Sequence, residues 1–197
     1  MNMPPAMSPW LNGWCPTARR IDSPNFGPRP EGSDIDLAVI HSISLPPGVY
    51  GGDGIEKLFT NQLDWSAHAY FEQIRGAEVS AHFVIRRDGE LLQFVSAHDR
   101  AWHAGTSSWR GRDNCNDYSL GIELEGLEDH PFEAAQYHAL AELLQQAARA
   151  YPIQQIAGHE HVAPGRKRDP GRAFDWAGLQ SLLGWGPACF PAGITSP

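Results

Sequence analysis

The sequence predicts a mixed α/β fold, in which a central mixed β-sheet is flanked by helices. Residues 37–41 form an apolar run without alternation, as expected for a central strand covered on both faces. Residues 79–85 and 118–125 alternate apolar and polar side chains, which is typical of half-buried strands. Residues 132–151 instead carry apolar side chains at helical spacing. This order of elements indicates a single domain over residues 1–197.

The two ends of the chain differ in composition from its middle. Residues 1–34 carry seven prolines, which predicts an extended arm and not a helix. Residues 184–197 are rich in Gly and Pro and are expected to form a flexible tail.

The predicted strands place polar side chains at defined positions. The run 37–41 delivers His41 to the C-terminal end of its strand. Asp88 and Gly89 predict a hairpin that joins the strand 79–85 to residues 90–95. One face of the strand 118–125 is polar and consists of Ser119, Gly121, Glu123 and Glu125.

Three helices are predicted. Ile55, Leu58 and Phe59 have the spacing of a short helix. The longest helix starts near Phe132 and ends at Pro152. Its continuous apolar stripe consists of Tyr137, Leu140, Ala141, Leu144, Ala148 and Tyr151. Asp175 can cap a last helix that carries Trp176, Leu179, Leu182 and Leu183.

Charge and composition exclude several classes of partner. A net charge of -8 argues against nucleic acid or an anionic membrane as the main partner. No stretch approaches the roughly 20 apolar residues of a membrane span. The three cysteines are odd in number and far apart, which argues against a disulfide framework. Since the N-terminus also lacks the pattern of a signal peptide, we expect a cytoplasmic protein.

Residues 158–171 hold two imidazoles, two carboxylates and a lysine in a segment rich in Pro and Gly, a composition typical of a site loop. His159 and Asp169 can meet on one ion if the loop turns back, which its Pro and Gly residues permit. His41 is the best candidate for a third ligand. Two imidazoles and one carboxylate suit a catalytic zinc ion, which keeps three protein ligands and a water.

Two other histidines compete for the role of ligand. His82 lies on a predicted strand face, and His161 could share a strand face with His159. A helical His-Glu-x-x-His motif is excluded, because Ala163 stands at the position of the second His. The sequence also contains no Gly-x-Ser-x-Gly motif and no Gly-rich phosphate loop.

Two charged residues have both a functional and a structural interpretation. Glu123 is a solvated carboxylate if its strand face meets water, and a proton acceptor for a zinc-bound water if that face lines a metal cleft. Lys167 is part of a solvated basic run with Arg166 and Arg168, or a cation placed where an oxyanion develops. The residues alone leave both questions open.

Five segments taken together resemble the AmpD-type N-acetylmuramoyl-L-alanine amidases, zinc enzymes of the peptidoglycan-recognition-protein fold. The segments are residues 39–48, 79–83, 100–105, 115–126, and a last one made of residues 163–167 and 169–171. The resemblance implies a cytoplasmic enzyme of cell-wall recycling that cleaves the amide between anhydro-N-acetylmuramic acid and L-alanine. It implies that His41, His159 and Asp169 hold zinc, that Glu123 accepts the proton and that Lys167 stabilises the transition state.

The expected partner is a small muropeptide, bound by a monomer without nucleic acid or membrane. Trp102 can stack on the sugar, and residues His103, Ala104 and Gly105 can bring backbone close to the ligand. Asn116 can hydrogen-bond an amide, or it can brace a turn. Arg166, Lys167 and Arg168 are expected to form a local basic pocket beside the zinc.

The chain departs from the family pattern at four places, namely Ser42, the pair Glu160–His161, Gly165 and Arg168. These departures leave the implied ligands and Lys167 intact, and they bear on loop rigidity and on substrate preference. Two alternative functions remain at this point. One is an endolysin-like amidase that acts on intact peptidoglycan, and the other is a non-catalytic peptidoglycan-recognition module.

Overall fold

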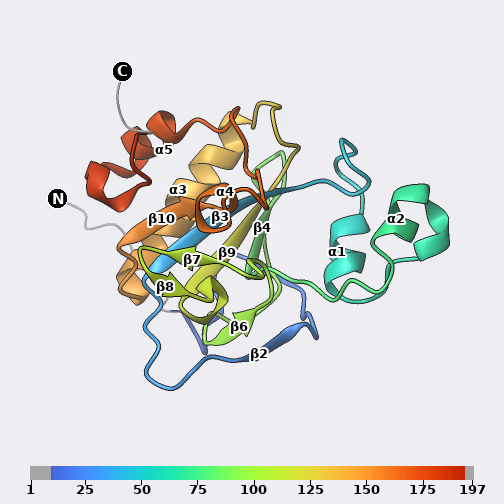
Figure 1. Cartoon of the computed structure of the whole chain (residues 1–197), viewed down its shortest axis with the longest axis horizontal. Coiled ribbons are helices and arrows are strands. Elements are labelled where there is room, and N and C mark those ends of the chain that lie inside the picture. The colour runs from blue at the N-terminus through green and yellow to red at the C-terminus, as the bar shows by residue number, and fades with distance from the viewer. Residues whose placement is uncertain (1–9, 194–197) are drawn as a thin grey trace.

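A six-stranded mixed sheet forms the centre of the molecule (Figure 1). The computed structural model describes residues 10–193 of the chain. The strand order is β1-β5-β4-β9-β3-β10, in which β4, β9, β3 and β10 run parallel and β5 runs antiparallel to β4. The strands are β1 (Arg19–Arg20), β3 (Leu37–Ile43), β4 (Phe83–Ile85), β5 (Leu91–Gln93), β9 (Ser119–Glu125) and β10 (Gln155–Gly158). The mixed α/β class predicted from the sequence is confirmed.

Four short strands form two further ribbons. Strand β2 (Phe26–Pro28) pairs antiparallel with β6 (Asp99–Ala101), and β7 (Ser108–Trp109) pairs with β8 (Arg112–Asp113). The segment between β6 and β9, which includes the short helix η2 (Cys115–Asp117), covers one face of the central sheet.

Different parts of the chain lie against the two faces of the sheet. Side chains from alternate positions of the central strands, such as Ile40 and Ile122, pack against α3 (Ala134–Ala150) and α5 (Trp176–Leu183). Figure 1 shows these two helices together on one side of the sheet. The opposite positions, which include His41 and Glu123, face the candidate site.

Both helices begin and end where the sequence predicts. In α3 the Gln136 side chain accepts from the Glu133 N–H and donates to the carbonyls of Ile85 and Glu125, so it ties the helix start to the sheet. The helix ends at Ala150, two residues before Pro152. In α5 the Asp175 carboxylate accepts from the Gly178 N–H at 2.8 Å, which is the predicted cap.

An excursion of residues 44–78 extends beyond the end of the sheet. It contains α1 (Gly54–Phe59), η1 (Trp65–Ala67) and α2 (Ala69–Gln73), which lie in Figure 1 on the side away from α3. Its apolar residues form a second core with Val84 and Leu92 of the sheet. The predicted short helix at residues 55–59 is confirmed as α1.

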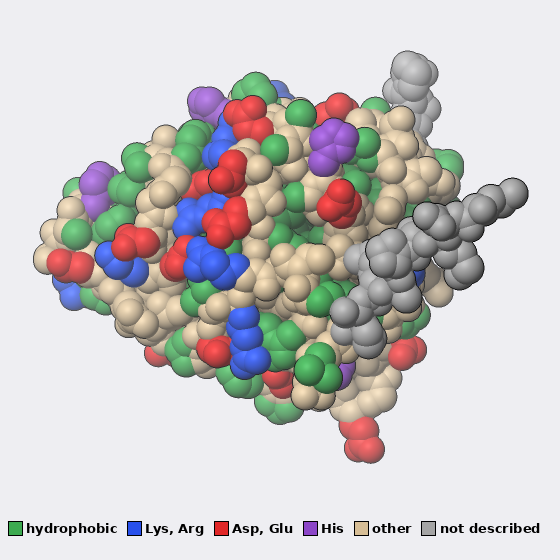
Figure 2. All heavy atoms as spheres, turned by 180° about the vertical axis from the view of Figure 1, so that it is seen from behind, with side chains coloured by type: hydrophobic (Ala, Val, Ile, Leu, Met, Phe, Trp, Pro, Cys, Tyr) green, Lys and Arg blue, Asp and Glu red, His purple; other side chains and the backbone are tan. Residues whose placement is uncertain are grey.

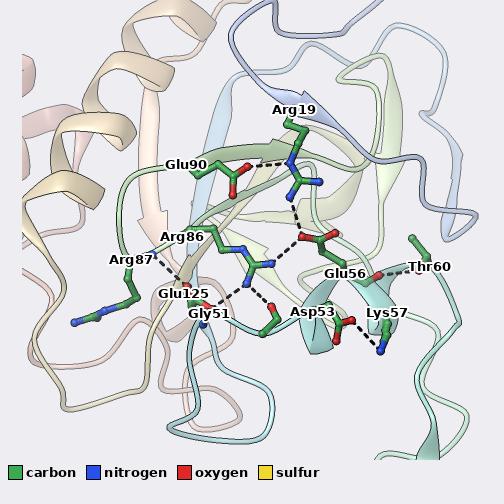
Figure 3. A network of polar contacts seen from close by, with 11 residues as sticks. Arg19, Gly51, Asp53, Glu56, Lys57, Thr60, Arg86, Arg87, Glu90 and Glu125 are labelled. Carbon is green, nitrogen blue, oxygen red and sulfur yellow. Dashed lines mark hydrogen bonds and ion pairs between the residues drawn. The ribbon is translucent and has the colours of Figure 1, made fainter.

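An ion-pair network centred on the buried Arg86 and Glu125 holds the excursion to the sheet (Figure 3). The Arg86 guanidinium bonds Glu56 of α1 at 2.8 Å and Glu125 of β9 at 3.1 Å, and it donates to the Gly52 carbonyl. Glu125 also accepts from the Gly51 N–H at 2.7 Å.

On the outer face seen in Figure 2, basic and acidic side chains are intermixed, so that face presents no large field of one sign.

Two expectations about strands need correction. The strand expected over residues 79–85 is reduced to Phe83–Ile85, and all three of its residues are buried, not alternately exposed. The reason is that the excursion covers the second face of this strand. The polar face of β9 is likewise buried, with Glu123 9% and Glu125 2% exposed. The predicted hairpin through Asp88 and Gly89 is confirmed by the pairing of β4 with β5.

The terminal segments are packed over much of their length. From residue 10 onward the N-terminal arm is largely extended and contributes β1 and β2, and its Cys15, Ser23 and Asn25 are buried. At the other end Phe190 is 1% exposed and packs in the main core, which differs from the flexible tail expected from Gly184 onward. Residues 1–9 and 194–197 lie outside the described part. None of the helices in residues 10–193 is long and apolar enough to span a bilayer.

Candidate metal centre and active site

Three ligand-type side chains converge at the carboxyl ends of neighbouring parallel strands, where open α/β sheets place their binding crevices. His41 lies two residues before the end of β3, and His159 is the first residue of α4 (His159–Val162), which directly follows β10. Asp169 returns from the loop after α4. The Nδ1 atoms of His41 and His159 are 2.9 Å apart, and each lies 3.1 Å from Oδ2 of Asp169.

These residues fit a zinc ion. Tetrahedral bonds of about 2.0–2.1 Å place neighbouring ligand atoms roughly 3.3 Å apart, close to the spacing here. All three side chains are buried, which removes competing solvent. Burial lowers the pKa of His41 to about 4 in spite of its bond to Asp169, so its imidazole is neutral, as metal ligation requires. Burial alone would raise the pKa of Asp169, but its bonds to His159 and His41 outweigh this, and its pKa lies well below the ordinary range.

The two competing histidines lie outside this cluster. His82 uses Nδ1 to accept from the Gly121 N–H, and its Nε2 lies 3.1 Å from the Asp99 carbonyl. His161 accepts from the Gly158 N–H and packs its ring edge against Trp176. The expectation that His161 shares a strand face with His159 is wrong, because both residues lie on α4.

Two consecutive loop residues contact the outer nitrogens of the two candidate histidine ligands. Nε2 of His159 lies 3.1 Å from the Ala104 carbonyl, and Nε2 of His41 lies 3.0 Å from Nδ1 of His103. Such outer contacts fix ring orientation and leave the inner nitrogen for a metal. Burial and the neighbouring His41 lower the pKa of His103 well below its ordinary value, so its ring is neutral near pH 7.

Glu123 lies beside the candidate metal centre. It is the register partner of His41 across β9 and β3. Its Oε2 is buried and has no hydrogen-bond partner within residues 10–193. Burial, together with the negative charge of Asp169, raises its pKa well above the ordinary range, while Lys167 acts in the opposite direction. The solvated-face interpretation of Glu123 is therefore wrong, and an unpaired buried carboxylate needs another explanation.

The three basic residues at positions 166–168 have different surroundings. Lys167 is exposed and lines the cleft together with Glu123. Arg166 donates to the carbonyls of Ala104 and Thr106, at 2.6 and 2.7 Å. Arg168 points to acidic residues, 3.6 Å from Asp129 and 4.0 Å from Glu128. Of the expected basic pocket, only Lys167 is therefore available beside the candidate centre.

A cleft of about 370 Å³ opens over these residues. Its lining includes His41, Glu123 and Asp169, together with Ser42 and Lys167. The excursion supplies an apolar wall that consists of Leu45, Pro47, Leu58, Phe59, Tyr70 and Ile74. A volume and lining of this kind suit a small-molecule ligand that has one polar and one apolar part.

The expected substrate contacts have different positions. Trp102 and His103 line the cleft, whereas Ala104, Gly105 and Asn116 do not. Asn116 is buried, and its Oδ1 accepts from the N–H groups of His103 and Ala104, at 3.3 and 2.8 Å. The structure thus supports the turn-bracing interpretation of Asn116 and makes Ala104 a partner of His159.

Sequence reasoning missed two supporting residues. Arg29, in the Pro-rich arm, donates to the carbonyls of Ala97, Asn116, Asp117 and Ser119, so it fixes the backbone that leads into β9. Burial lowers its pKa to about 10. Ser119 bonds the Cys115 carbonyl at 2.6 Å and faces His103. Ser119 lies in the segment 115–126 and on the predicted polar strand face, so only its supporting role was missed. Arg29 stands in no local motif, and a charged residue in a Pro-rich segment was the one available signal for it.

Comparisons with known proteins identify a family and several similar structures. Residues 31–172 match the family model described as N-acetylmuramoyl-L-alanine amidase. The chain is 48% identical over 173 residues to the 1,6-anhydro-N-acetylmuramyl-L-alanine amidase AmpD of Citrobacter freundii, which covers 87% of this chain and 92% of the relative. A crystal structure of a Se-Met AmpD derivative superposes with a TM-score of 0.86 at 48% identity, over 88% of this chain and 98% of that one.

Two more distant structures are also similar. One is the Escherichia coli amidase AmiD in complex with the substrate anhydro-N-acetylmuramic acid-L-Ala-D-γ-Glu-L-Lys, with 28% identity and a TM-score of 0.56 over 78% of this chain and 60% of that one. The other is the Drosophila peptidoglycan recognition protein SA, with a TM-score of 0.61 over 90% of this chain and 95% of that one. At 18% identity, this last likeness concerns the fold alone.

Proposed function

This chain belongs to the N-acetylmuramoyl-L-alanine amidase family, and on this premise we propose its reaction, its metal and the roles of its residues. The chain is an amidase that hydrolyses the amide between 1,6-anhydro-N-acetylmuramic acid and the L-alanine of muropeptides, in peptidoglycan recycling. The observation that carries the assignment of roles is the convergence of two imidazole nitrogens and a carboxylate oxygen beside the unpaired carboxylate of Glu123.

His41, His159 and Asp169 are the proposed zinc ligands. Two neutral nitrogens and one anionic oxygen match the donor set that catalytic zinc prefers, and three protein ligands leave a position open toward the cleft. Zinc held there would supply a Lewis acid that acidifies a coordinated water and polarises the amide carbonyl.

Glu123 is the proposed general base and acid. With its raised pKa, its carboxylate is suited to take the proton of the attacking water and to hand it to the leaving nitrogen of L-alanine. The carbon–oxygen bond then forms and the carbon–nitrogen bond breaks, which releases anhydro-N-acetylmuramic acid and a stem peptide with a free amino group. Its unpaired Oε2 is explained if the reacting water is its hydrogen-bond partner.

Lys167 is the proposed oxyanion stabiliser. Lys167 lines the same cleft, whereas Arg166 bonds backbone carbonyls and Arg168 lies near acidic side chains. A cation at this place stabilises the negative charge that develops on the carbonyl oxygen in the tetrahedral transition state.

The cleft has a suitable wall for each part of the substrate. We assign the apolar wall and Trp102 to the sugar, because a sugar ring face packs on aromatic and aliphatic side chains. The stem peptide would extend past Lys167. A soluble fragment of this size, processed by a monomer in the cytoplasm, is consistent with the acidic net charge of the chain.

A paired-substrate assay tests this function. The purified zinc-loaded protein is given anhydro-N-acetylmuramyl-L-Ala-D-γ-Glu-L-Lys and, in parallel, intact sacculi, and the products are identified by mass. We expect release of the free peptide from the anhydro substrate at a far higher rate than any release from sacculi. Equal or faster cleavage of sacculi would favour an endolysin-like amidase, and binding without cleavage of either would favour a recognition module. The Glu123→Gln protein serves as the control for contaminating amidase.

A further inference from the structure

The outer nitrogen of His41 has an unusual partner. Metal-bound histidines commonly donate their second N–H to a carboxylate or to a backbone carbonyl, both of which can only accept. His159 follows this pattern with the Ala104 carbonyl. His41 instead faces Nδ1 of His103, which can donate or accept depending on its tautomer. Something beyond His103 must therefore determine which nitrogen of His41 carries the proton.

The hydrogen bonds beyond His103 determine this direction. The Cys115 carbonyl can only accept, so the Ser119 hydroxyl at 2.6 Å uses its single hydrogen there. The Ser119 Oγ then faces Nε2 of His103, at 3.3 Å, with a lone pair, and that nitrogen must donate. In the neutral ring Nδ1 is then an acceptor, and it takes the N–H of His41 Nε2 at 3.0 Å. The lone pair of His41 Nδ1 is left toward His159 and Asp169.

We propose that Ser119 and His103 are positioning residues, which form a hydrogen-bond relay from the Cys115 carbonyl that sets the tautomer of His41 for metal binding. This inference rests on the proposed zinc centre and adds the hydrogen bonds that set the tautomer of one of its ligands. The relay spans η2, β9, the loop at residues 102–105 and β3, so it links the ligand to three separate segments.

The lack of a side chain at Gly121 leaves room for the His103 ring on the sheet. Gly121 of β9 lies directly under it, and a Cβ at residue 121 would stand 2.4 Å from His103 Cγ and 2.7 Å from Nδ1. Any side chain at this position would displace the ring. The backbone of His103 is held as well, through its N–H bond to Asn116. Ring and backbone are thus both fixed, which a relay of directed hydrogen bonds requires.

Four substitutions separate the acceptor role of His103 from its bulk. His103→Asn places an amide oxygen near the position of Nδ1 and keeps an acceptor for His41. His103→Phe keeps an aromatic ring on Gly121 and removes the acceptor. Ser119→Ala removes the group that sets the direction, and Gly121→Ala moves an unaltered His103. Thermal melts of each zinc-loaded protein verify that it is folded before any comparison.

Zinc affinity is the first readout, measured by competition with a chromophoric chelator and without any turnover. We expect His103→Phe and Gly121→Ala to weaken zinc binding by about 10–100-fold, the usual effect of losing an outer partner of a ligand. His103→Asn is expected to recover most of this loss. Equal affinity of the folded His103→Phe and wild-type proteins would overturn the relay, as would equal losses in His103→Phe and His103→Asn.

The tautomer is the second readout, obtained from nitrogen chemical shifts of 15N-histidine-labelled protein. We expect His41 to carry its proton on Nε2 in the wild-type protein, and Ser119→Ala to turn His103 into a mixture of tautomers. A wild-type His41 with its proton on Nδ1 would overturn the proposal. If the wild-type protein takes up no zinc, the proposed metal centre fails, whereas the tautomer of His103, with its proton on Nε2 toward Ser119, still tests the relay in the metal-free protein.

Discussion

Glu123 and His41 are register partners on the adjacent parallel strands β9 and β3. Because side chains alternate along a strand, this register directs the carboxylate and the imidazole to the same face of the sheet, at the same edge. A slip of one residue would turn Glu123 into the core under α3. The separation between the proposed base and the proposed metal ligand is therefore fixed by backbone hydrogen bonds of the sheet and not by a mobile loop, which is how a precise site is best held.

The first prediction concerns metal content. His159→Ala removes one of the three convergent ligand atoms, so we expect the purified variant to lose most of its zinc in elemental analysis. His161→Ala is the matched control, because this neighbouring imidazole bonds Gly158 and lies outside the cluster. It should retain about one zinc per chain. Full zinc occupancy in His159→Ala would contradict the assignment.

The second prediction concerns Glu123. Glu123→Gln keeps the size of the side chain and removes the base, so zinc should stay bound while kcat falls by roughly 100-fold or more. Glu142→Gln on the exposed side of α3 makes the same chemical change away from the cleft and should leave kcat unchanged. The two variants are compared in steady-state assays at saturating substrate. A kcat close to the wild-type value in Glu123→Gln would exclude Glu123 as the base.

The third prediction separates Lys167 from its basic neighbours. Lys167→Met should lower kcat by about 100–1,000-fold, the usual cost of losing an oxyanion-stabilising group, with little change in zinc content. Arg168→Met should have a small effect, since its guanidinium faces Glu128 and Asp129. Similar losses in the two variants would mean that the loop needs positive charge in general, and that Lys167 has no special role.

The fourth prediction concerns the ion-pair network of Figure 3. Arg86→Ala leaves Glu125, which is 2% exposed, without its buried ion-pair partner, so we expect a loss of about 3–5 kcal/mol in the free energy of unfolding. The matched control is Arg75→Ala, which removes an exposed pair with Glu72 and should leave stability nearly unchanged. Urea denaturation measures both. Equal midpoints for Arg86→Ala and the wild-type protein would show that the network does not stabilise the fold.

The fifth prediction concerns stability in acid. Burial, together with the nearby Arg29, lowers the pKa of His82 to about 3, from about 6.5 in an unfolded chain. Between these two values the unfolded chain binds a proton at this residue that the folded chain does not bind. Stability therefore falls as the pH falls through this window, by up to about 1.4 kcal/mol per pH unit from His82 alone.

His82→Gln should flatten this dependence by the equivalent of one proton. The free energy of unfolding of both proteins is measured by urea denaturation at several pH values within the window. The slope is the relevant quantity, because the substitution also alters stability at neutral pH through the lost bond with Gly121. Parallel slopes for the two proteins would show that His82 titrates normally in the fold.

Several features of this protein follow from local sequence alone. The strand that carries His41, the helix from Ala134 and its Asp175-capped successor all follow from the spacing of apolar residues and from caps, which depend on neighbours in the chain. His159 and Asp169 were candidate ligands because one Pro- and Gly-rich segment holds them both. These signals lie within one segment, so they can be read without knowing what covers it. The choice of His41 over His82 and His161 instead came from the family resemblance.

Only the tertiary structure decided what surrounds those segments. Glu123 became a buried carboxylate because the excursion and the segment after β6 cover its strand face, and those residues are distant in sequence. His103 lines the cleft but also contacts His41 of β3, while Ala104 contacts His159 of α4 and Asn116 of η2 bonds the loop backbone, and these partners are all distant in sequence. The three basic residues at positions 166–168 do not form one pocket, because Arg166 bonds backbone carbonyls and Arg168 faces carboxylates of other loops. Burial and hydrogen-bond partnership are properties of long-range contacts, and a local pattern does not contain them.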